Sequence, residues 1–396
     1  MKNIIVCGSR FGQFYIEALK RMEGINIVGL LAKGSKRSCE CANYYAIPMY
    51  ASIDEIKEKV DVACVAVKTG TLGGEGAILA KQLLDKKINV LLEQPVHYKE
   101  LGECYKTARN QNVYFGVGNL YLNLPAVNNF MRNVKIIKKE EKISYINVDL
   151  ATQVSYPVIS ILGEVLETLR PWKNIGEING KIPFQTQSIK LGDIPVNFRA
   201  HNEIERGKID GFLHLLFQIS VGFPSGHLTL CDPHGPVIWN PRIHFPDENI
   251  IPGRLKDISA SNLGETNTVT LYSNEKTQNI IFMEEWPRAI VKDIERALKN
   301  PIEVDNKNMQ KVLSDSQAWQ LLMKGFGYPE IVNGSVYEFF SSENLLREKN
   351  HFSEKCDSII GGMALFNDIC LTYELKVLNK KITLSYGFMV SLSCNT

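Results

Sequence analysis

Residues 2–15 read KNIIVCGSRFGQFY, and this stretch decides the fold of the first part of the chain. The apolar run from Ile4 to Cys7 leads through a turn with two glycines into residues 14–22, where apolar positions recur at helical spacing. A strand, a glycine turn and a helix in this order open a β-α-β unit. We therefore expect the chain to begin with a parallel sheet flanked by helices.

The same alternation continues to about residue 124. Short apolar runs are followed by helical patterns, as in a doubly wound α/β domain. Residues 25–31 are apolar on both faces, which is typical of a buried parallel strand. Further strands are predicted at residues 61–67, 89–92 and 113–117, and helices at residues 76–86 and 102–111.

The first turn lies where a Rossmann domain carries its dinucleotide fingerprint, G-x-G-x-x-G, whose glycines let the backbone approach the pyrophosphate at the helix N-terminus. Cys7 and Ser9 replace the first two glycines, and Gly12 keeps the third. The alternative is a tight turn that binds no ligand. The residues of this turn expected to contact a cofactor are Gly8, Ser9, Arg10, Phe11 and Gly12.

The end of the second strand indicates which dinucleotide binds. NAD-binding domains place an acidic residue there, whereas NADP-binding domains offer groups that bind the 2′-phosphate. Residues 31–38, LAKGSKRS, contain no acid, and Lys33, Ser35 and Arg37 can donate hydrogen bonds to a phosphate. This pattern favours NADPH over NADH, although a solvated basic loop also explains the charges.

Beyond residue 125 the pattern changes to long strands with few helices. Strands are predicted at residues 144–150, 213–221, 227–231 and 267–272, and helices at residues 157–169, 288–299 and 306–324. A mainly antiparallel sheet with helices on one face is the expected architecture. We assign residues 1–124 to the dinucleotide-binding domain, 125–344 to an α+β substrate and dimerisation domain, and 345–396 to a C-terminal extension with a predicted hairpin at 369–378 and 381–386.

The composition excludes several classes of protein. The 396 residues are 44% hydrophobic and 22% charged, with a net charge of only +2, so no basic surface for nucleic acid or an anionic membrane is expected. No segment approaches the roughly 20 apolar residues of a membrane span or resembles a signal peptide. The nine cysteines lack a disulfide or zinc-site spacing, and the pair Cys39 and Cys41 is expected to lie on a helix. A cytoplasmic protein is predicted.

Residues 2–15 together with Glu93, Gln94 and Pro95 resemble the glucose-fructose oxidoreductase and inositol dehydrogenase superfamily. More narrowly, the sequence resembles the thiazolinyl imine reductases of siderophore biosynthesis, known from pyochelin and yersiniabactin assembly. The narrower resemblance spans residues 1–330 and is most specific in residues 228–246. It rests on the stretches VCGSRFGQFY, LLAKGSKRS, TGTLGGEGAILAKQLLDKKINVLLEQPVH, NLYLNLPAV and LTLCDPHGPVIWNPRIHFP.

This resemblance implies NADPH-dependent reduction of one thiazoline C=N bond to a thiazolidine by a homodimer. The substrate would be tethered to a carrier domain of a nonribosomal peptide synthetase. Because hydride transfer to the imine carbon leaves negative charge on the nitrogen, such a site needs a general acid beside the nicotinamide. Tyr121, which follows the strand at residues 113–117, is the first candidate, against the alternative of a structural tyrosine among the fifteen in the chain.

The residue after Glu93 is usually lysine in the superfamily and histidine in the imine reductases, but it is Gln94 here. An amide cannot act as an acid, so whether Tyr121 acts alone stays open. His97 is the second candidate, although a loop histidine is more often structural. Glu93 and Pro95 are expected to shape the turn that holds the nicotinamide, with Gln94 beside it. Residues expected to touch the cofactor at the end of the central strand are Thr69 and Gly70.

His234 and Trp239 lie in the most family-like stretch and are the candidates for substrate binding, with Trp239 as an apolar wall. The alternative is a turn between two strands with a core tryptophan. Two other functions stay open: a sugar, inositol or biliverdin-type oxidoreductase on the same fold, and a dinucleotide-binding sensor without catalysis. Serine hydrolase, P-loop and zinc protease motifs are absent from the sequence.

Overall fold

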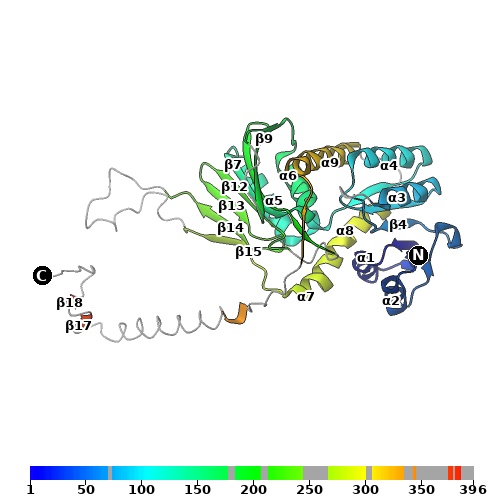
Figure 1. Cartoon of the computed structure of the whole chain (residues 1–396), viewed down its shortest axis with the longest axis horizontal. Coiled ribbons are helices and arrows are strands. Elements are labelled where there is room, and N and C mark those ends of the chain that lie inside the picture. The colour runs from blue at the N-terminus through cyan, green and yellow to red at the C-terminus, as the bar shows by residue number, and fades with distance from the viewer. Residues whose placement is uncertain are drawn as a thin grey trace. The chain divides into compact units, whose positions relative to one another are not determined.

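The computed structural model describes residues 1–69, 74–176, 183–206, 213–243, 266–299, 306–333, 342–344, 373–377 and 380–384. The chain divides into two compact units, residues 1–334 and 335–396. The first unit contains both sheets predicted above (Figure 1).

In the described residues, the N-terminal sheet has six parallel strands in the order β3-β2-β1-β4-β5-β6, the doubly wound Rossmann arrangement. Its strands are β1 (Lys2–Cys7), β2 (Ile25–Leu31), β3 (Met49–Tyr50), β4 (Val62–Val65), β5 (Asn89–Glu93) and β6 (Phe115–Gly118). Its helices are α1 (Gly12–Leu19), α2 (Lys36–Tyr45), α3 (Gly76–Asp85) and α4 (Tyr98–Gln111), with a short 3-10 turn at Ile53–Glu55. The predicted fold of this domain is confirmed.

Burial explains why the strands were predictable. All four residues of β4 are buried, as are the last four of β1 and of β2, because helices cover both faces of a parallel sheet. The predicted bounds of β2 are those observed. Helix α2 was predicted only around Cys39 and Cys41, without bounds; only Ser38 and Ala42 of its ten residues are buried, so it has almost no apolar stripe.

The second sheet has eight strands in the described residues, in the order β15-β14-β13-β12-β7-β10-β9-β8. Only β10 and β7 pair in parallel, so the sheet is mainly antiparallel, as predicted. Its strands are β7 (Tyr145–Ala151), β8 (Trp172–Asn174), β9 (Phe184–Leu191), β10 (Ile194–His201), β12 (Phe217–Phe223), β13 (Gly226–Leu230), β14 (Val237–Pro241) and β15 (Val269–Tyr272). A separate pair joins β11 (Glu203–Glu205) to β16 (Glu330–Val332).

Helices α5 (Pro125–Ile137) and α6 (Ser155–Leu166) pack on one face of this sheet (Figure 1). Residues 278–299 form a helical run that starts with α7 (Gln278–Ile280), widens to a π-helical turn at Ile281–Glu285 and continues as α8 (Trp286–Lys299). Helix α8 packs against α1, β5 and β6 of the first sheet, and α9 (Asn306–Phe326) packs on α6 and α4. Helices late in the chain therefore lie against the Rossmann domain.

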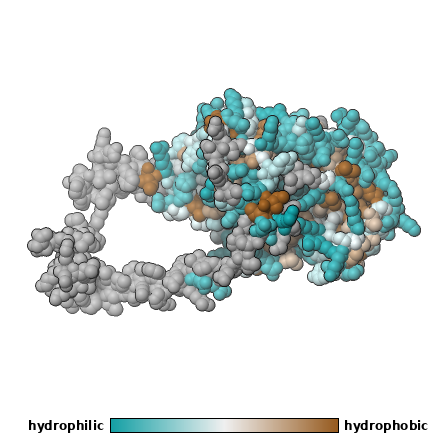
Figure 2. All heavy atoms as spheres, in the orientation of Figure 1, coloured by the Kyte–Doolittle hydropathy of each residue, from teal (hydrophilic) through white to brown (hydrophobic). Residues whose placement is uncertain are grey.

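The opposite face of the second sheet carries polar side chains. Asn197 of β10 accepts a hydrogen bond from Ser188 on β9 at 2.8 Å and donates one to Asn147 on β7 at 3.1 Å. Arg199 pairs with Asp149 on the same face at 2.6 Å. On the side of the molecule shown in Figure 2, hydrophilic residues prevail and apolar residues form small separate patches.

In the second unit, β17 (Tyr373–Val377) and β18 (Lys380–Leu384) pair antiparallel, which confirms the predicted hairpin with shorter strands. In the part of the chain that is described, no helix is both long and apolar enough to cross a bilayer. Cys39 and Cys41 lie on α2 with free thiols, as predicted.

Candidate dinucleotide and substrate site

A cavity of about 990 Å³ opens at the carboxyl ends of β1, β4 and β5. Ligands bind at this edge in doubly wound folds. Both sheets' domains contribute to its lining. Among the lining residues are Arg10, Phe11, Arg37, Lys68, Thr69, Glu93, Gln94, Pro95 and Tyr121 from the first domain and its boundary, and Gln153, His234, Trp286 and Trp319 from later in the chain.

The glycine turn after β1 leaves no room for side chains. Gly8 has φ +90°, and a Cβ there would lie 2.7 Å from the carbonyl oxygen of Ala66. Its backbone N–H donates to the carbonyl of Leu31 at 2.9 Å, which fixes the turn between β2 and β4. A Cβ on Gly12 would lie 3.0 Å from the side chain of Val6. Close packing against Ala66 and Val6 thus requires glycine at both positions, and neither glycine is among the residues that line the cavity, whereas the nearby Arg10 and Phe11 are. Ser9, between them and Gly8, is not.

At the end of β2 the three predicted phosphate ligands differ in their surroundings. Arg37 lines the cavity. Ser35 caps α2, because its hydroxyl oxygen accepts a hydrogen bond from the N–H of Ser38 at 3.3 Å. Lys33 forms an ion pair with Glu75 in which both side chains are more than half exposed, so the pair is weak. The sequence argument missed Glu75 because it is distant in the chain.

The loop after β5 is held from two sides. The hydroxyl of Thr69 donates to the carbonyl of Pro95, and the hydroxyl of Ser316 on α9 donates to the carbonyl of Val96 at 2.6 Å. Thr69, Gln94 and Pro95 line the cavity as a fixed wall. Gly70 lies outside the described residues.

Glu93, the last residue of β5, has a buried partner. The hydroxyl of Tyr15 on α1 donates to its carboxyl group. Burial and the nearby charge of Asp293 raise the pKa of Glu93 to about 8, although the Tyr15 hydrogen bond opposes the shift. Glu93 is therefore largely protonated at pH 7.

Tyr121 lies in a 3-10 turn at Leu120–Asn123, directly after β6. It is only 6% exposed, and the exposed part faces the cavity that it lines. Its ring lies 5.6 Å from that of Phe217 on β12 and 6.3 Å from that of Trp286 on α8. The structure therefore places Tyr121 where the two sheets' domains meet, as predicted from the sequence.

His97 has a different position. It is the N-cap of α4, where its Nδ1 accepts a hydrogen bond from the N–H of Lys99 at 3.2 Å. Its ring stacks on that of Tyr98, and it is not among the residues that line the cavity. A catalytic role of His97 stays a prediction that this geometry does not favour.

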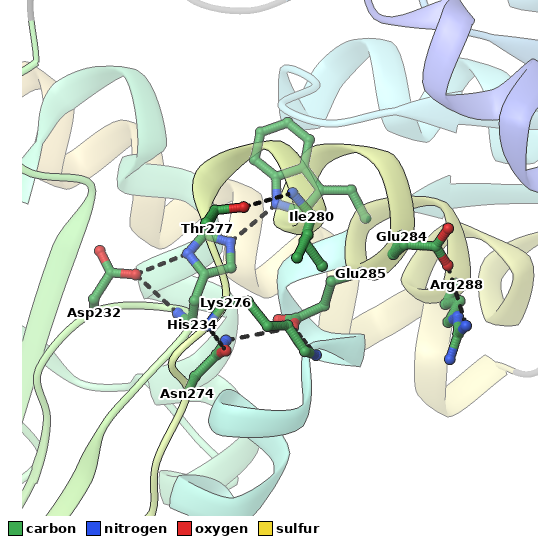
Figure 3. A network of polar contacts seen from close by, with 10 residues as sticks. Asp232, His234, Asn274, Lys276, Thr277, Ile280, Glu284, Glu285 and Arg288 are labelled. Atoms are coloured by element: carbon green, nitrogen blue, oxygen red, sulfur yellow. Dashed lines mark hydrogen bonds and ion pairs between the residues drawn. The ribbon is translucent and has the colours of Figure 1, made fainter.

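His234 lines the cavity from the turn between β13 and β14 (Figure 3). The side chain of Asp232 lies 2.8 Å from its Nδ1, and the indole N–H of Trp286 donates to its Nε2 at 3.0 Å. Since Nε2 accepts, the neutral imidazole carries its proton on Nδ1 and donates it to Asp232. Both nitrogens are thus engaged within the protein, and His234 holds the indole in place.

Trp239 lies on β14 with its ring 6.5 Å from that of Phe223, and it is not among the lining residues. The aromatic wall comes instead from Trp286, whose ring lies 5.1 Å from that of Phe14 and 6.0 Å from that of Phe11. Sequence reasoning missed Trp286 because it is distant in the chain. A second missed residue is Lys68, next to the predicted Thr69, which is also among the lining residues.

Residues 2–119 match the model of the GFO/IDH/MocA family, described as an oxidoreductase family with an NAD-binding Rossmann fold. The match covers the first domain and stops just before Tyr121. Residues 2–119 are thus similar to the NAD-binding Rossmann domain of that family. No curated protein matches the chain.

Solved structures share the fold over most of the chain. A dehydrogenase from Chromobacterium violaceum is 12% identical with a TM-score of 0.59, covering 82% of this chain and 95% of its own. Biliverdin reductase from Synechocystis, in complex with biliverdin and NADP+, is 12% identical with a TM-score of 0.57, covering 82% and 98%. An oxidoreductase from Agrobacterium radiobacter, in complex with NAD+, L-tartaric acid and magnesium, is 10% identical with a TM-score of 0.55, covering 80% and 94%. At these identities the similarity establishes the two-domain fold alone.

The residues present fit a nicotinamide dinucleotide. The glycine turn opens helix α1, whose N-terminus would hold a pyrophosphate, and Arg10 and Arg37, whose guanidinium groups can bind phosphate, are among the residues that line the cavity. The bound dinucleotide would supply the hydride.

Proposed function

We propose that the protein is an NADPH-dependent oxidoreductase that reduces the C=N bond of a thiazoline to a thiazolidine. The substrate would be a siderophore intermediate tethered to a carrier domain of a nonribosomal peptide synthetase. NADPH is proposed rather than NADH because Arg37 lines the cavity and the end of β2 itself carries no acid. A cytoplasmic homodimer that pairs through the second sheet belongs to the same proposal.

The observation that carries the proposal is the pair Tyr121 and Gln94 in one cavity. Reduction of an imine needs a proton at nitrogen as the hydride reaches carbon, and the Tyr121 hydroxyl can give it to a nitrogen that becomes strongly basic. Gln94 cannot supply or remove a proton, but it can hydrogen-bond a carboxamide or a substrate. The ring of Trp286 offers an apolar wall for an aromatic acyl group.

Lys68 favours a second candidate function. Oxidation of a sugar or polyol carbinol needs a base, and Lys68, which lines the cavity, carries an amine, whereas the amide of Gln94 cannot act as a base. An NADP-dependent sugar or inositol-type oxidoreductase is therefore the alternative, and a dinucleotide-binding sensor would require that neither reaction occurs.

The test is NADPH consumption by the purified protein with a hydroxyphenyl-thiazoline thioester, beside reactions with inositol or glucose and NADP+. Turnover of the thiazoline that falls strongly in Tyr121→Phe supports the proposal. Turnover of polyols alone, lost in Lys68→Met, establishes the alternative. Binding of the cofactor with no turnover of any substrate favours the non-catalytic dinucleotide-binding sensor.

A further inference from the structure

Three ionisable side chains that the proposed reaction does not use meet behind the cavity. Glu93 comes from β5, Tyr15 from α1 and Asp293 from α8. A Cβ on Gly118 would lie 3.3 Å from Oε2 of Glu93 and 3.7 Å from Oδ2 of Asp293, so the two oxygens are no more than about 7 Å apart. The carboxyl groups therefore interact across a buried space.

The two carboxyl groups are not equivalent. Asp293 accepts hydrogen bonds from the N–H of Asn119 at 2.9 Å, from the side chain of Asn123 at 2.7 Å and from the guanidinium of Arg296. Glu93 receives one, from Tyr15. Of a coupled buried pair, the member with three donors including a cation holds the negative charge. Asp293 is thus the anion and Glu93 the acid.

Other groups around Glu93 reinforce this assignment. The thiol of Cys64 on the adjacent strand β4 stays neutral, because burial raises its pKa well above the usual value, and burial likewise raises the pKa of Tyr15. The cation of the cluster, Arg296, contacts Asp293. The pKa of Glu93, about 8, lies where a proton can be exchanged near neutral pH.

Glu93 also reaches the ligand space. Its side chain is partly exposed, and it lines the cavity beside Gln94 and Pro95. This is the carboxyl edge of the sheet, where the reactive end of a dinucleotide is expected. A charge that appears on the nicotinamide ring would therefore act directly on Glu93.

We propose that Glu93 carries a proton while the reduced cofactor is bound and releases it as the ring becomes oxidised, so that one residue couples proton supply to hydride transfer. The inference rests on the proposed function only in that a nicotinamide cofactor binds in this cavity. Glu93 changes from neutral acid to anion as the neighbouring ring changes from neutral to positive, and the two charges compensate.

The step balances. The bound dinucleotide would supply the hydride that forms the new C–H bond on the substrate carbon. The C=N π pair would move to nitrogen, where an N–H bond forms with the proton of the Tyr121 hydroxyl, whose O–H bond breaks. The O–H bond of Glu93 would then break as its proton restores the Tyr121 hydroxyl through the cavity that both residues line, and Glu93 is left as the anion.

Proton exchange on cofactor binding tests this without any substrate. Titration calorimetry of the full chain at pH 7, in buffers with different ionisation enthalpies, counts the protons released per dinucleotide. With a pKa of about 8, roughly 0.9 of the Glu93 carboxyl groups are protonated at pH 7, so binding of NADP+ should release up to about 0.9 proton more than binding of NADPH. NADP+ and NADPH carry the same phosphates, so a difference in proton release between them arises from the nicotinamide ring.

Variants test whether the released proton comes from Glu93. Glu93→Gln should abolish the difference, whereas Glu103→Gln, an exposed glutamate on α4, should leave it unchanged. Tyr15→Phe keeps the carboxyl group but removes the hydrogen bond that lowers its pKa, so the pH midpoint of the difference should rise. Asp293→Asn removes the charge that raises this pKa and should move the midpoint down.

Equal proton release with NADP+ and NADPH, or a difference that persists in Glu93→Gln, overturns the inference. If neither dinucleotide binds, both this inference and the proposed function fail. Proton-linked binding of NADP+ without turnover of any thiazoline upholds the role of Glu93 and refutes the proposed reaction.

Discussion

Replacing Trp286 by phenylalanine tests the contact that shapes the cavity wall. The substitution removes the N–H that donates to Nε2 of His234 at 3.0 Å, and it leaves that nitrogen unpartnered in a side chain that is only 10% exposed. Loss of one partner of a buried hydrogen bond costs about 1–3 kcal/mol. Trp286→Phe should lower the free energy of unfolding by that amount, measured from the midpoint and slope of urea denaturation.

A double-mutant cycle with His234→Ala isolates the contact. If the indole and the imidazole stabilise each other, the two substitutions should show a coupling of about 0.5–3 kcal/mol. Trp172→Phe provides the matched control, since its indole N–H donates at 3.3 Å to the exposed Asn174 on the same strand, β8, and it should be additive with His234→Ala. Additivity of Trp286→Phe with His234→Ala to within about 0.5 kcal/mol would refute the proposed role of His234 in holding the indole.

The remaining predictions concern the cofactor site and its proton donor. Tyr121→Phe should lower kcat for thiazoline reduction by about 10²–10⁴-fold with the Kd for NADPH unchanged, since only proton transfer is lost; a similar fall in cofactor affinity would contradict this. Arg37→Ala should weaken NADPH binding by about 10–100-fold and NADH binding little, because a charge-assisted hydrogen bond contributes about 1.5–3 kcal/mol; equal losses measured by fluorescence titration would argue against a 2′-phosphate contact. Gly8→Ala should abolish dinucleotide binding and lower Tm, whereas Gly24→Ala, also at positive φ but with open space around it, should only lower Tm through backbone strain of about 1–2 kcal/mol.

The fold could be predicted because its signals are local. Residues 25–31 are apolar throughout since both faces of β2 are covered, and this pattern is visible without any long-range information. The bounds of helix α2 could not be predicted, because only two of its ten residues are buried and the helix lacks an apolar stripe. The helix after Tyr121, α5, was also not predicted, although the proline at its first position is a common start signal.

Residues of the site could be predicted only where a functional side chain follows directly after a predicted strand. Thr69, Gln94 and Tyr121 each follow a predicted strand of one sheet, so they were expected to meet, and all three line the cavity. Trp286 and Asp293 come from helix α8, which begins 165 residues after Tyr121, and no pattern in the sequence links them to that edge. Trp239 was chosen for its family-like surroundings, but strand register turns it toward Phe223 instead.

The contact between Ser316 and the loop after β5 has a mechanical consequence. The family match ends at residue 119, yet the carbonyl of Val96 is bound by a helix that begins at Asn306, and the N–H of Asn119 is bound by Asp293. The Rossmann domain is therefore not an independent module, because the edge of its sheet that faces the cavity is hydrogen-bonded to helices α8 and α9. A fragment of residues 1–124 would lack both hydrogen bonds, and a transfer of this domain into a relative would have to include α8 and α9.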